Sequence, residues 1–375
     1  MKQPLKILLL TLLVVSHFTC RKKNPELSEP SRTFYMGVTP WPADFTTAEV
    51  NNAYSFINNN CDIVSHHFDE GIPYEEAYTN SNWPVGLIED INKRVTKTAA
   101  GKKILLSSSA LALSRNTKAP YSKYSDNIQA SLKKEWEQLP FNDPKVVTAY
   151  TNFIIYLINA IKPAYINYGV ESNLDTWNDA DFILYKDFLR QVFAGVKSAY
   201  PSIPLMVSFI VTETPQSLAF ANQLVPYTDY IALSAYPYTH VSSSANGNTN
   251  PALFPADFFT KYINLANDKP FCFAETGYIA EPLLIPFFNL NKQGNEQWQN
   301  DYLQMICNLT NERKGKFIIW FCQKDYDAGV RTLKSLGLYQ DLFGLWQNTG
   351  LTNENNVQRP AYTTWINWMK LKKIE

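Results

Sequence analysis

The stretch "KPFCFAETGY", residues 269–278, is apolar or aromatic from Pro270 to Ala274 and turns polar at Glu275. A short apolar run of this kind predicts a strand that is buried on both faces, as in a parallel sheet covered by helices. Parallel α/β folds bind their ligands at the carboxyl ends of the strands. Glu275 therefore stands where such a fold would place a functional carboxylate.

Amphipathic helical patterns alternate with short apolar runs along the chain. One of these helices opens with Thr46 and Glu49 at capping-box spacing, and two more begin near Asp181 and Glu296. Besides residues 270–278, the apolar runs span residues 34–41, 61–68, 103–110, 164–172, 204–211, 229–238 and 316–323. Eight alternations of strand and helix predict an α/β fold, a closed (β/α)₈ TIM barrel in a single domain over residues 34–375. An open doubly wound sheet is the alternative, but "GVTPWP" stands where that fold needs a glycine-rich phosphate turn.

The longest connection between predicted strands comprises residues 111–145, after the third strand. It contains Tyr121, Tyr124 and Trp136. A connection of this length predicts a lid or a wall over the barrel mouth. At the other end of the chain, a helical pattern over residues 361–369 predicts the last helix of the barrel.

The first residues have the features of an export signal. Residues 1–19 combine Lys2 and Lys6 with an apolar run that is too short to span a bilayer. The ending "SHFTC" resembles a bacterial lipoprotein signal, which implies that Cys20 is lipidated. An ordinary secretory signal and a retained single anchor are the alternatives. We expect an exported lipoprotein that is anchored to a membrane at the cell envelope, with residues 20–33 as a flexible tether.

Composition narrows the classes of partner. Removal of residues 1–19 leaves 32 basic and 34 acidic side chains, a net charge of −2 that does not favour nucleic acid. The chain has 22 Tyr, 22 Phe and 9 Trp, and aromatic rings of this number can serve both the core and a carbohydrate site. Cys61, Cys272, Cys307 and Cys322 lack CxxC spacing, so we expect no metal, although a disulfide is open in an exported protein. We read Cys61, Cys272 and Cys322 as apolar core filler.

Two glutamates follow strands that face each other across the predicted barrel. Glu171 ends the fourth apolar run, in "INYGVESN", and Glu275 ends the seventh. A pair of carboxylates on opposite sides of a groove can cleave a glycosidic bond, because one protonates the leaving oxygen and the other stabilises the developing charge. Tyr236 or Tyr238, after the sixth strand, is expected to donate a hydrogen bond that keeps Glu275 ionised.

These residues resemble the clan of retaining (β/α)₈ glycoside hydrolases that carry an acid/base glutamate after strand 4 and a nucleophilic glutamate after strand 7. The "ETG" context, the aromatic sixth strand and Trp320 are most similar to the arabinogalactan endo-β-1,4-galactanase family. The resemblance implies hydrolysis of β-glycosidic bonds in an oligo- or polysaccharide by double displacement, with no cofactor and in a monomer. It implies Glu171 as acid/base and Glu275 as nucleophile.

The resemblance also implies residues that bind the substrate. Tyr236 would hold the nucleophile, Trp320 would form the floor beneath the sugar, and His66 or His67 would line the same subsite; only one of these adjacent histidines can face the mouth. The clan usually has an asparagine directly before the acid/base, whereas this chain has Val170. Asn173 or Asn167 is the candidate to replace it.

Two other function classes remain open at this stage. A carbohydrate-binding lipoprotein on the same barrel, without turnover, would use Trp41, Trp177 and Trp320 as stacking surfaces, and Val170 favours this reading. A barrel lyase or deacetylase is the third possibility. Deacetylases of this shape need a cluster of metal ligands, and only three histidines remain after the signal, two of them consecutive.

Overall fold

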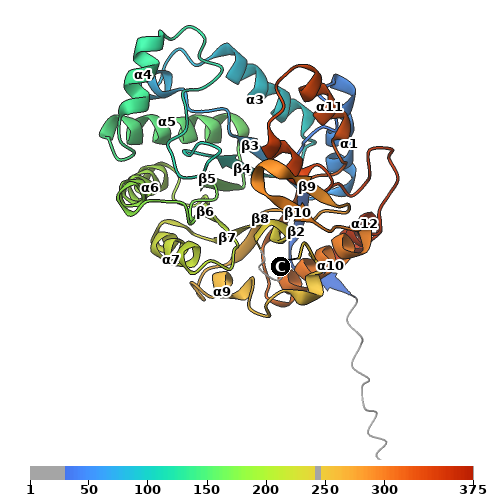
Figure 1. Cartoon of the computed structure of the whole chain (residues 1–375). Coiled ribbons are helices and arrows are strands. Elements are labelled where there is room, and N and C mark those ends of the chain that lie inside the picture. Colours follow the sequence, from blue (N-terminus) through green and yellow to red (C-terminus); the bar gives the residue numbers. More distant parts are fainter. Residues whose placement is uncertain (1–29, 241–245, 375) are drawn as a thin grey trace, which may run out of the picture. The chain divides into compact units, whose positions relative to one another are not determined.

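The chain folds into a closed barrel of eight parallel strands surrounded by helices (Figure 1). The computed structural model describes residues 30–240 and 246–374. In barrel order the strands are β2 Tyr35–Val38, β3 Ile63–Phe68, β4 Lys103–Ser108, β5 Tyr165–Gly169, β6 Leu205–Ile210, β7 Ile231–Ala235, β8 Phe271–Thr276 and β11 Phe317–Trp320, and β11 closes on β2. The predicted TIM barrel in one domain is therefore confirmed, with each strand inside the run that predicted it.

Helices fill the connections and cover the outside of the barrel. In the described part of the chain, seven helices come ahead of a barrel strand: α1 Thr47–Asn60, α3 Val85–Lys97, α5 Pro144–Ile161, α6 Asp179–Ala199, α7 Pro215–Leu224, α9 Thr260–Ile263 and α10 Glu296–Glu312. Helix α12, Pro360–Lys370, follows the last barrel strand. Further helices α2 Tyr74–Thr79, α4 Ala130–Gln138, α8 Pro237–His240 and α11 Asp327–Ser335 lie in the connections that lead to them. The cap predicted at Thr46 is confirmed, because its hydroxyl accepts a hydrogen bond from the backbone of Glu49. Helix α6 starts earlier than predicted, since Asn178 caps it.

Alternation along the strands separates two cores. Residues on one face, such as Ile63, Met206 and Cys272, pack together inside the barrel. Their neighbours, such as Val64 and Val207, pack outward against the helices. This period of two explains why the predicted strands are apolar throughout, and it also decides which strand-end residues can face the mouth. Cys61, Cys272, Cys307 and Cys322 are free thiols and buried, as the core-filler reading of Cys61, Cys272 and Cys322 predicted.

The folded unit begins at Ser31, three residues before the predicted boundary at Phe34. Ser31–Arg32 forms strand β1, which pairs with β12, Lys372–Lys373, at the amino ends of the barrel strands. Arg32 is buried and contacts the Asp62 carboxylate at 2.7 Å, which fastens this segment just ahead of β3. Residues 1–29, including the predicted signal and Cys20, lie outside the described residues. Among the helices that are described, none has the length and apolar content of a membrane span.

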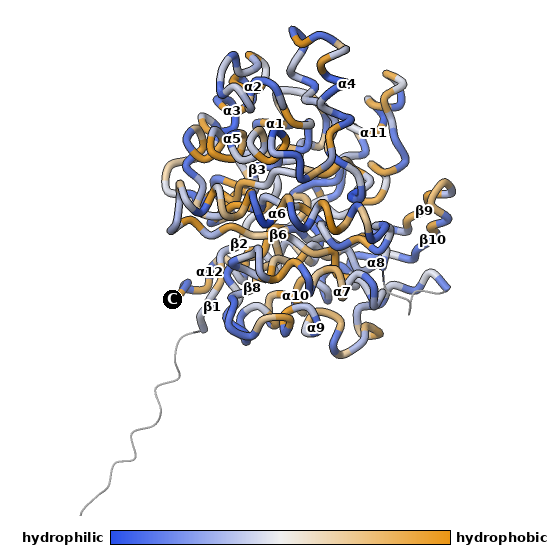
Figure 2. Tube along the Cα trace, turned by 90° about the vertical axis from the view of Figure 1, so that its left-hand side faces the viewer, coloured by the Kyte–Doolittle hydropathy of each residue, from blue (hydrophilic) through white to orange (hydrophobic). Residues whose placement is uncertain are grey.

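The opposite end of the barrel carries the longer connections. A hairpin of β9, Leu283–Ile285, and β10, Leu290–Lys292, follows β8 and contacts a 3-10 helix, η5, Asp341–Trp346. Figure 2, a side view, shows this hairpin and α11 projecting at one end and β1 with α12 at the other. The mouth of the barrel therefore opens at the end away from β1.

Candidate active site

A cleft at the carboxyl ends of the barrel strands contains both predicted glutamates. Its main cavity has a volume of about 370 Å³ and is lined by Glu171, Glu275 and Arg115 among others. A smaller cavity of about 170 Å³ adjoins it and shares Arg115 and Glu171, but it is completed by Tyr236 and His240. Glu171 thus lines both cavities, whereas Glu275 lines only the larger one.

Glu275 is aimed at the mouth by an irregularity in its strand. Along β8 the inward positions are Cys272 and Ala274, and strict alternation would turn Glu275 outward. The pairing with β7 contains an extra residue, because Leu233 pairs with Phe273 and the next residue of β7 pairs with Glu275. A bulge of this kind re-aims the side chain at the end of a strand.

The residues after Glu275 explain the "ETG" sequence. Thr276 donates its hydroxyl to the Ala235 carbonyl at 2.8 Å, which ties β8 to β7. A side chain on Gly277 would place its Cβ 2.6 Å from the carbonyl oxygen of Phe321. Glycine is therefore required for the chain after β11 to approach β8 this closely.

The Glu275 carboxyl contacts two groups, and its surroundings oppose its ionisation. Tyr236 donates its hydroxyl to Oε1, and His67 Nδ1 lies 3.8 Å from Oε2. Burial raises the pKa of Glu275, and the nearby charge of Glu171 raises it further. His67 and the Tyr236 hydrogen bond oppose this rise. Glu171 lines the same cavity as Glu275, so the two carboxyl groups share one cleft.

Glu171 is fixed in a turn directly after β5. Its backbone adopts the left-handed conformation, with φ +53°, and its N–H donates to the Ser208 hydroxyl at 3.0 Å. In the carboxylate, Oε1 accepts a hydrogen bond from Ser234 at 2.7 Å and Oε2 accepts one from Arg115 Nε at 2.8 Å. Both oxygens are therefore held by the protein.

Arg115 joins Glu171 to a second carboxylate. Its side chain reaches the cleft from the connection after β4, and its Nη2 lies 3.0 Å from Asp69 Oδ2. His67 Nε2 lies 3.3 Å from the same Asp69 oxygen. Burial opposes ionisation of Asp69, but Arg115 and His67 outweigh it and hold the pKa of that carboxyl far below its usual range. Burial lowers the pKa of His67, and the charges of Asp69 and Glu275 more than reverse this, so the net shift is upward.

Aromatic rings form the apolar wall of the main cavity. Trp41, Phe321 and Trp346 line it, with ring centroids 5.7 Å apart for Trp41 and Phe321 and 6.1 Å apart for Phe321 and Trp346. The indole N–H of Trp41 is buried and has no hydrogen-bond partner. This wall combines flat apolar surfaces with an unused donor, which suits a ligand that has both C–H faces and hydroxyl groups.

The structure brings four of the predicted site residues together. Glu171, Glu275 and His67 line the main cavity, and Tyr236 lines the smaller one while it holds Glu275. The connection after β4 also reaches the cleft, through Leu113 and Arg115. Its three aromatic residues do not line either of these two cavities: Tyr121 and Trp136 are buried against α2.

Four other predicted site residues lie outside the cleft. His66 is buried on the outward face of β3, where Nε2 is 3.1 Å from the Thr98 hydroxyl. Asn173 is buried, donates to the Ile210 and Ser217 carbonyls and so links the turn after β5 to β6. Tyr238 donates to the Leu345 carbonyl from a fully buried position.

Trp320 is the fourth, and the alternation of β11 is the reason. Phe317 and Ile319 point into the barrel, so Trp320 points outward into the helix layer, where its N–H donates to the Thr349 carbonyl at 2.9 Å. The proposed asparagine substitutes do not reach the cleft either, since Asn167 lies buried within the sheet and donates to Ser208 at 3.1 Å. Val170 is likewise buried.

Sequence reasoning missed Arg115, Ser234 and His240. Ser234 could have been found, because its hydroxyl interrupts the apolar part of the run "DYIALSAYPY" and it lies on the strand next to β8. Arg115 gives no periodic signal, because its position depends on the conformation of a connection. In the described part of the chain, His, Cys, Asp and Glu side chains form no group of three or more that could bind a metal.

Comparison with known proteins finds structures with a similar fold but no related sequence. Neither a family model nor a curated protein matches the sequence. Solved structures match over nearly the whole chain. A glycoside hydrolase family 53 catalytic domain from Ignisphaera aggregans has a TM-score of 0.58 at 18% identity, over 94% of this chain and 99% of that chain. The exo-β-1,4-mannosidase Op5Man5 from Opitutaceae bacterium strain TAV5 has a TM-score of 0.60 at 12% identity over 92% of this chain.

A third similar structure contains a sugar. It is a variant of a family 5, subfamily 18 glycoside hydrolase from Streptomyces cattleya in complex with Manβ1-4GlcNAc, with a TM-score of 0.62 at 12% identity, over 91% of this chain and 82% of that chain. The present chain spans 60% of the length of the Opitutaceae enzyme. At these identities the comparisons show that the barrel is structurally similar to TIM-barrel glycoside hydrolases, which is a statement about the fold.

Proposed function

We propose that the protein is a retaining glycoside hydrolase that cleaves a β-glycosidic bond with Glu275 as nucleophile and Glu171 as acid/base. The observation that carries this proposal is the convergence on one cavity of two carboxyl groups from opposed parts of the barrel, Glu171 directly after β5 and Glu275 on β8. The similarity of the barrel to glycoside hydrolases supports it. A retaining mechanism requires the two carboxyl groups to stand about 5–5.5 Å apart.

The first step is a displacement at the anomeric carbon. Tyr236 occupies Oε1 of Glu275, which leaves Oε2 as the attacking oxygen. A bond forms between Oε2 and the anomeric carbon, the glycosidic C–O bond breaks, and Glu171 gives its proton to the leaving oxygen. In the second step Glu171 takes a proton from water, the water oxygen bonds to the anomeric carbon, and the bond to Glu275 breaks.

We infer from the two cavities where the two sides of the substrate bind. The glycone lies in the main cavity, because only that cavity is lined by Glu275. The leaving part lies in the smaller cavity beside Tyr236 and His240, and Glu171 stands at the boundary where the bond breaks. A cleft that continues on both sides of the cleavage point favours endo action, as in a β-galactanase-like enzyme.

Arg115 has a part in this cycle. Glu171 must carry a proton before the first step, whereas in the free protein its Oε2 accepts from Arg115. Arg115 also contacts Asp69, so it can keep one ion pair when a substrate takes its place at Glu171. The bond to Glu171 therefore belongs to the resting site, and the bond to Asp69 persists in the complex.

The test is hydrolysis of β-1,4-galactan, β-1,4-mannan and mixed-linkage β-glucan by the mature protein, with the anomer of the first product followed by NMR. We expect one of them to be cleaved with retained configuration. The isosteric change Glu275→Gln should reduce the rate by at least about 10³-fold. Glu89→Gln, on the exposed face of α3, is the matched control and should hydrolyse normally. Undiminished hydrolysis by Glu275→Gln would remove Glu275 from the mechanism.

A carbohydrate-binding protein without turnover is the second candidate. Two observations favour it: Val170 stands buried before Glu171, and Arg115 occupies the carboxylate that should donate the proton. Calorimetry separates the two functions. A glycan that binds and stays intact through a long incubation selects the binding protein.

We also propose that Cys20 carries the lipid that anchors the protein to a membrane at the cell envelope. The motif "SHFTC" before the charged residues 21–23 supports this. In membrane fractions of cells that express the full chain, the parent should sediment with the membrane and Cys20→Ser should not. Equal sedimentation of the two would exclude lipidation at Cys20.

A further inference from the structure

A second large cavity lies next to the cleft on the mouth side of the barrel. It has a volume of about 620 Å³ and is formed between the start of α3 and the connection after β4. The residues that the following argument uses are Glu76, Trp83, Tyr124, Ser125, Asp126 and Asn127.

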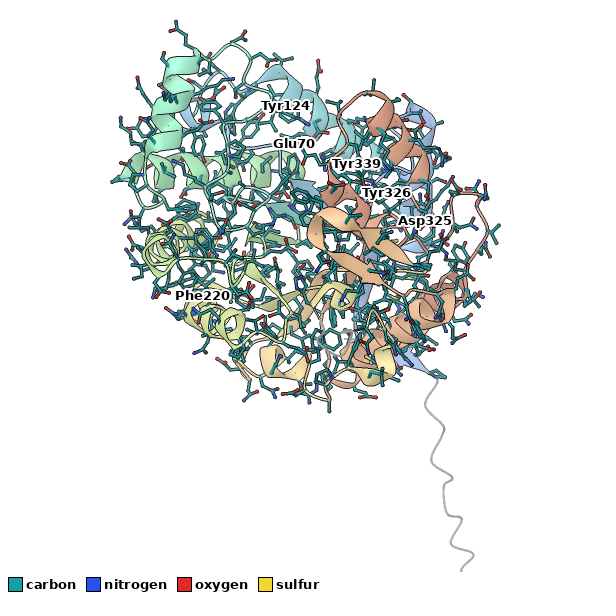
Figure 3. All side chains as sticks on the ribbon, viewed as in Figure 1. Glu70, Tyr124, Phe220, Asp325, Tyr326 and Tyr339 are labelled. Atoms are coloured by element: carbon teal, nitrogen blue, oxygen red, sulfur yellow. The ribbon has the colours of Figure 1, made fainter. Side chains whose placement is uncertain are left out.

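This cavity lies beside the main cavity, beyond the ion pair of Glu70 and Lys123. Glu70 and Lys123 line the main cavity and form an ion pair of 2.6 Å. The Lys123 ammonium lies 5.2 Å from the centre of the Tyr124 ring, and that ring lines the second cavity. Figure 3 labels Glu70 and Tyr124 close to each other in the upper part of the view, near α3. A chain of sugars that leaves the main cavity over Glu70 therefore reaches the second cavity next.

The second cavity has rigid aromatic surfaces. Trp83 is stacked on Tyr156, with ring centroids 3.9 Å apart and an interplanar angle of 12°, so its indole is fixed in orientation. The Tyr124 ring rests on Gly86, where a Cβ would come within 2.9 Å of its Cδ1. The two rings provide flat apolar faces of the kind that pack against the C–H faces of sugars.

The polar groups of the second cavity define the charge of its ligand. Glu76 is buried and accepts a hydrogen bond from Tyr121 at 2.7 Å. The Ser125 hydroxyl is buried and has no hydrogen-bond partner, and Asp126 and Asn127 are exposed at the rim. None of the described residues that line the cavity is lysine or arginine, so it does not suit an anion, whereas its oxygen atoms can accept hydrogen bonds from hydroxyl groups.

We propose that this cavity is a distal subsite that binds a neutral sugar unit of the same polysaccharide whose cleavage point lies between Glu171 and Glu275. The inference rests on the proposed function. The sugar stacks on Trp83 and donates hydroxyl groups to the oxygens around it. The subsite lengthens the binding groove on the glycone side without touching the reacting atoms.

The experiment uses the mature protein with Glu275→Gln, which binds without turnover. Native affinity electrophoresis in gels that contain β-1,4-galactan, β-1,4-mannan or mixed-linkage β-glucan measures binding. Adding Trp83→Ala should weaken binding of the retained polysaccharide about tenfold. Changing Asp126 and Asn127 together to alanine should weaken binding severalfold. Both residues are exposed, so these changes leave the packing of the aromatic rings intact. Trp298→Ala, a partly buried tryptophan on α10, is the matched control and should bind like the parent.

The outcomes separate the distal subsite from the enzymatic function. The subsite is overturned if neither Trp83→Ala nor the combined change of Asp126 and Asn127 to alanine alters binding. It is also overturned if Trp298→Ala weakens binding as much as Trp83→Ala does, or if none of the polysaccharides retards the parent protein. Hydrolysis by the protein with Glu275 intact is measured in parallel. If hydrolysis occurs and Trp83→Ala neither raises KM nor weakens binding, only the subsite fails. If Trp83 supports binding and nothing is hydrolysed, only the enzymatic function fails.

Discussion

Arg115 donates a hydrogen bond of 2.8 Å to Glu171, and this contact joins the connection after β4 to the turn after β5 in the middle of the cleft. The same guanidinium holds Asp69, so one cation lies between two carboxylates. The side chains of all three are at least three-quarters buried. The contact fixes the resting geometry of the site and is open to direct tests.

We expect the ion pairs of Arg115 to contribute to the free energy of unfolding. Arg115→Gln leaves Glu171 without its cation and Asp69 with His67 alone, and we expect a loss of about 1–3 kcal/mol of unfolding free energy at pH 7. Adding Asp69→Asn removes one of the stranded charges and should recover part of this loss. Urea denaturation of the four proteins of this cycle measures the coupling. Purely additive effects would show that the ion pair contributes nothing.

We expect the charge of Glu171 to affect the acid limb of the profile of kcat/KM against pH. The attacking form of Glu275 is the carboxylate, and its raised pKa means that this form is lost as the pH falls through a value above that of an ordinary glutamate. Glu171→Gln removes the second contribution to that rise, so the acid limb should move to lower pH. The profile of kcat/KM is measured with 2,4-dinitrophenyl β-galactoside, β-mannoside and β-glucoside, whose leaving group needs little protonation. An unmoved limb would contradict the coupling of the two carboxyl groups.

His66 should make the folded state sensitive to acid. Burial and the charge of Arg94 lower its pKa to about 3, whereas the unfolded chain takes up a proton near pH 6.5. Its contribution to stability is therefore complete above about pH 6.5 and is lost as the pH falls toward 3, by roughly 3–5 kcal/mol over the whole window. His66→Asn should flatten the fall of unfolding free energy between pH 6.5 and 4.5. His67→Asn, the neighbour in the cleft, should instead reduce activity; equal flattening by both variants would refute the assignment.

We expect substitution of Trp320 to reduce stability and substitution of Trp346 to weaken substrate binding. Trp320 is fully buried and its N–H bonds to Thr349, so Trp320→Phe should cost about 1–3 kcal/mol by orphaning that carbonyl. Trp346 lines both cavities of the cleft, so Trp346→Ala should raise KM for the polysaccharide with a smaller loss of stability. Chemical denaturation and steady-state kinetics of both variants check this. A rise in KM with Trp320→Phe equal to that with Trp346→Ala would return Trp320 to the site.

The barrel and the two glutamates could be predicted from the sequence because both follow from simple periodicities. Apolar runs mark the strands, and a polar residue at the end of a run marks the mouth. The residues around the glutamates depend on finer geometry. The outward direction of His66 and Trp320 follows from which residues of β3 and β11 point inward, and sequence cannot fix that parity. Glu275 reaches the mouth only through a bulge, and the contact of Arg115 depends on a loop conformation.

The pairing of β1 with β12 fixes where the folded unit starts relative to the cleft. Ser31 lies at the amino end of the barrel strands, and the cleft opens at their carboxyl ends. A ligand that fills the cleft therefore approaches the barrel from the end opposite to the one where the folded chain begins.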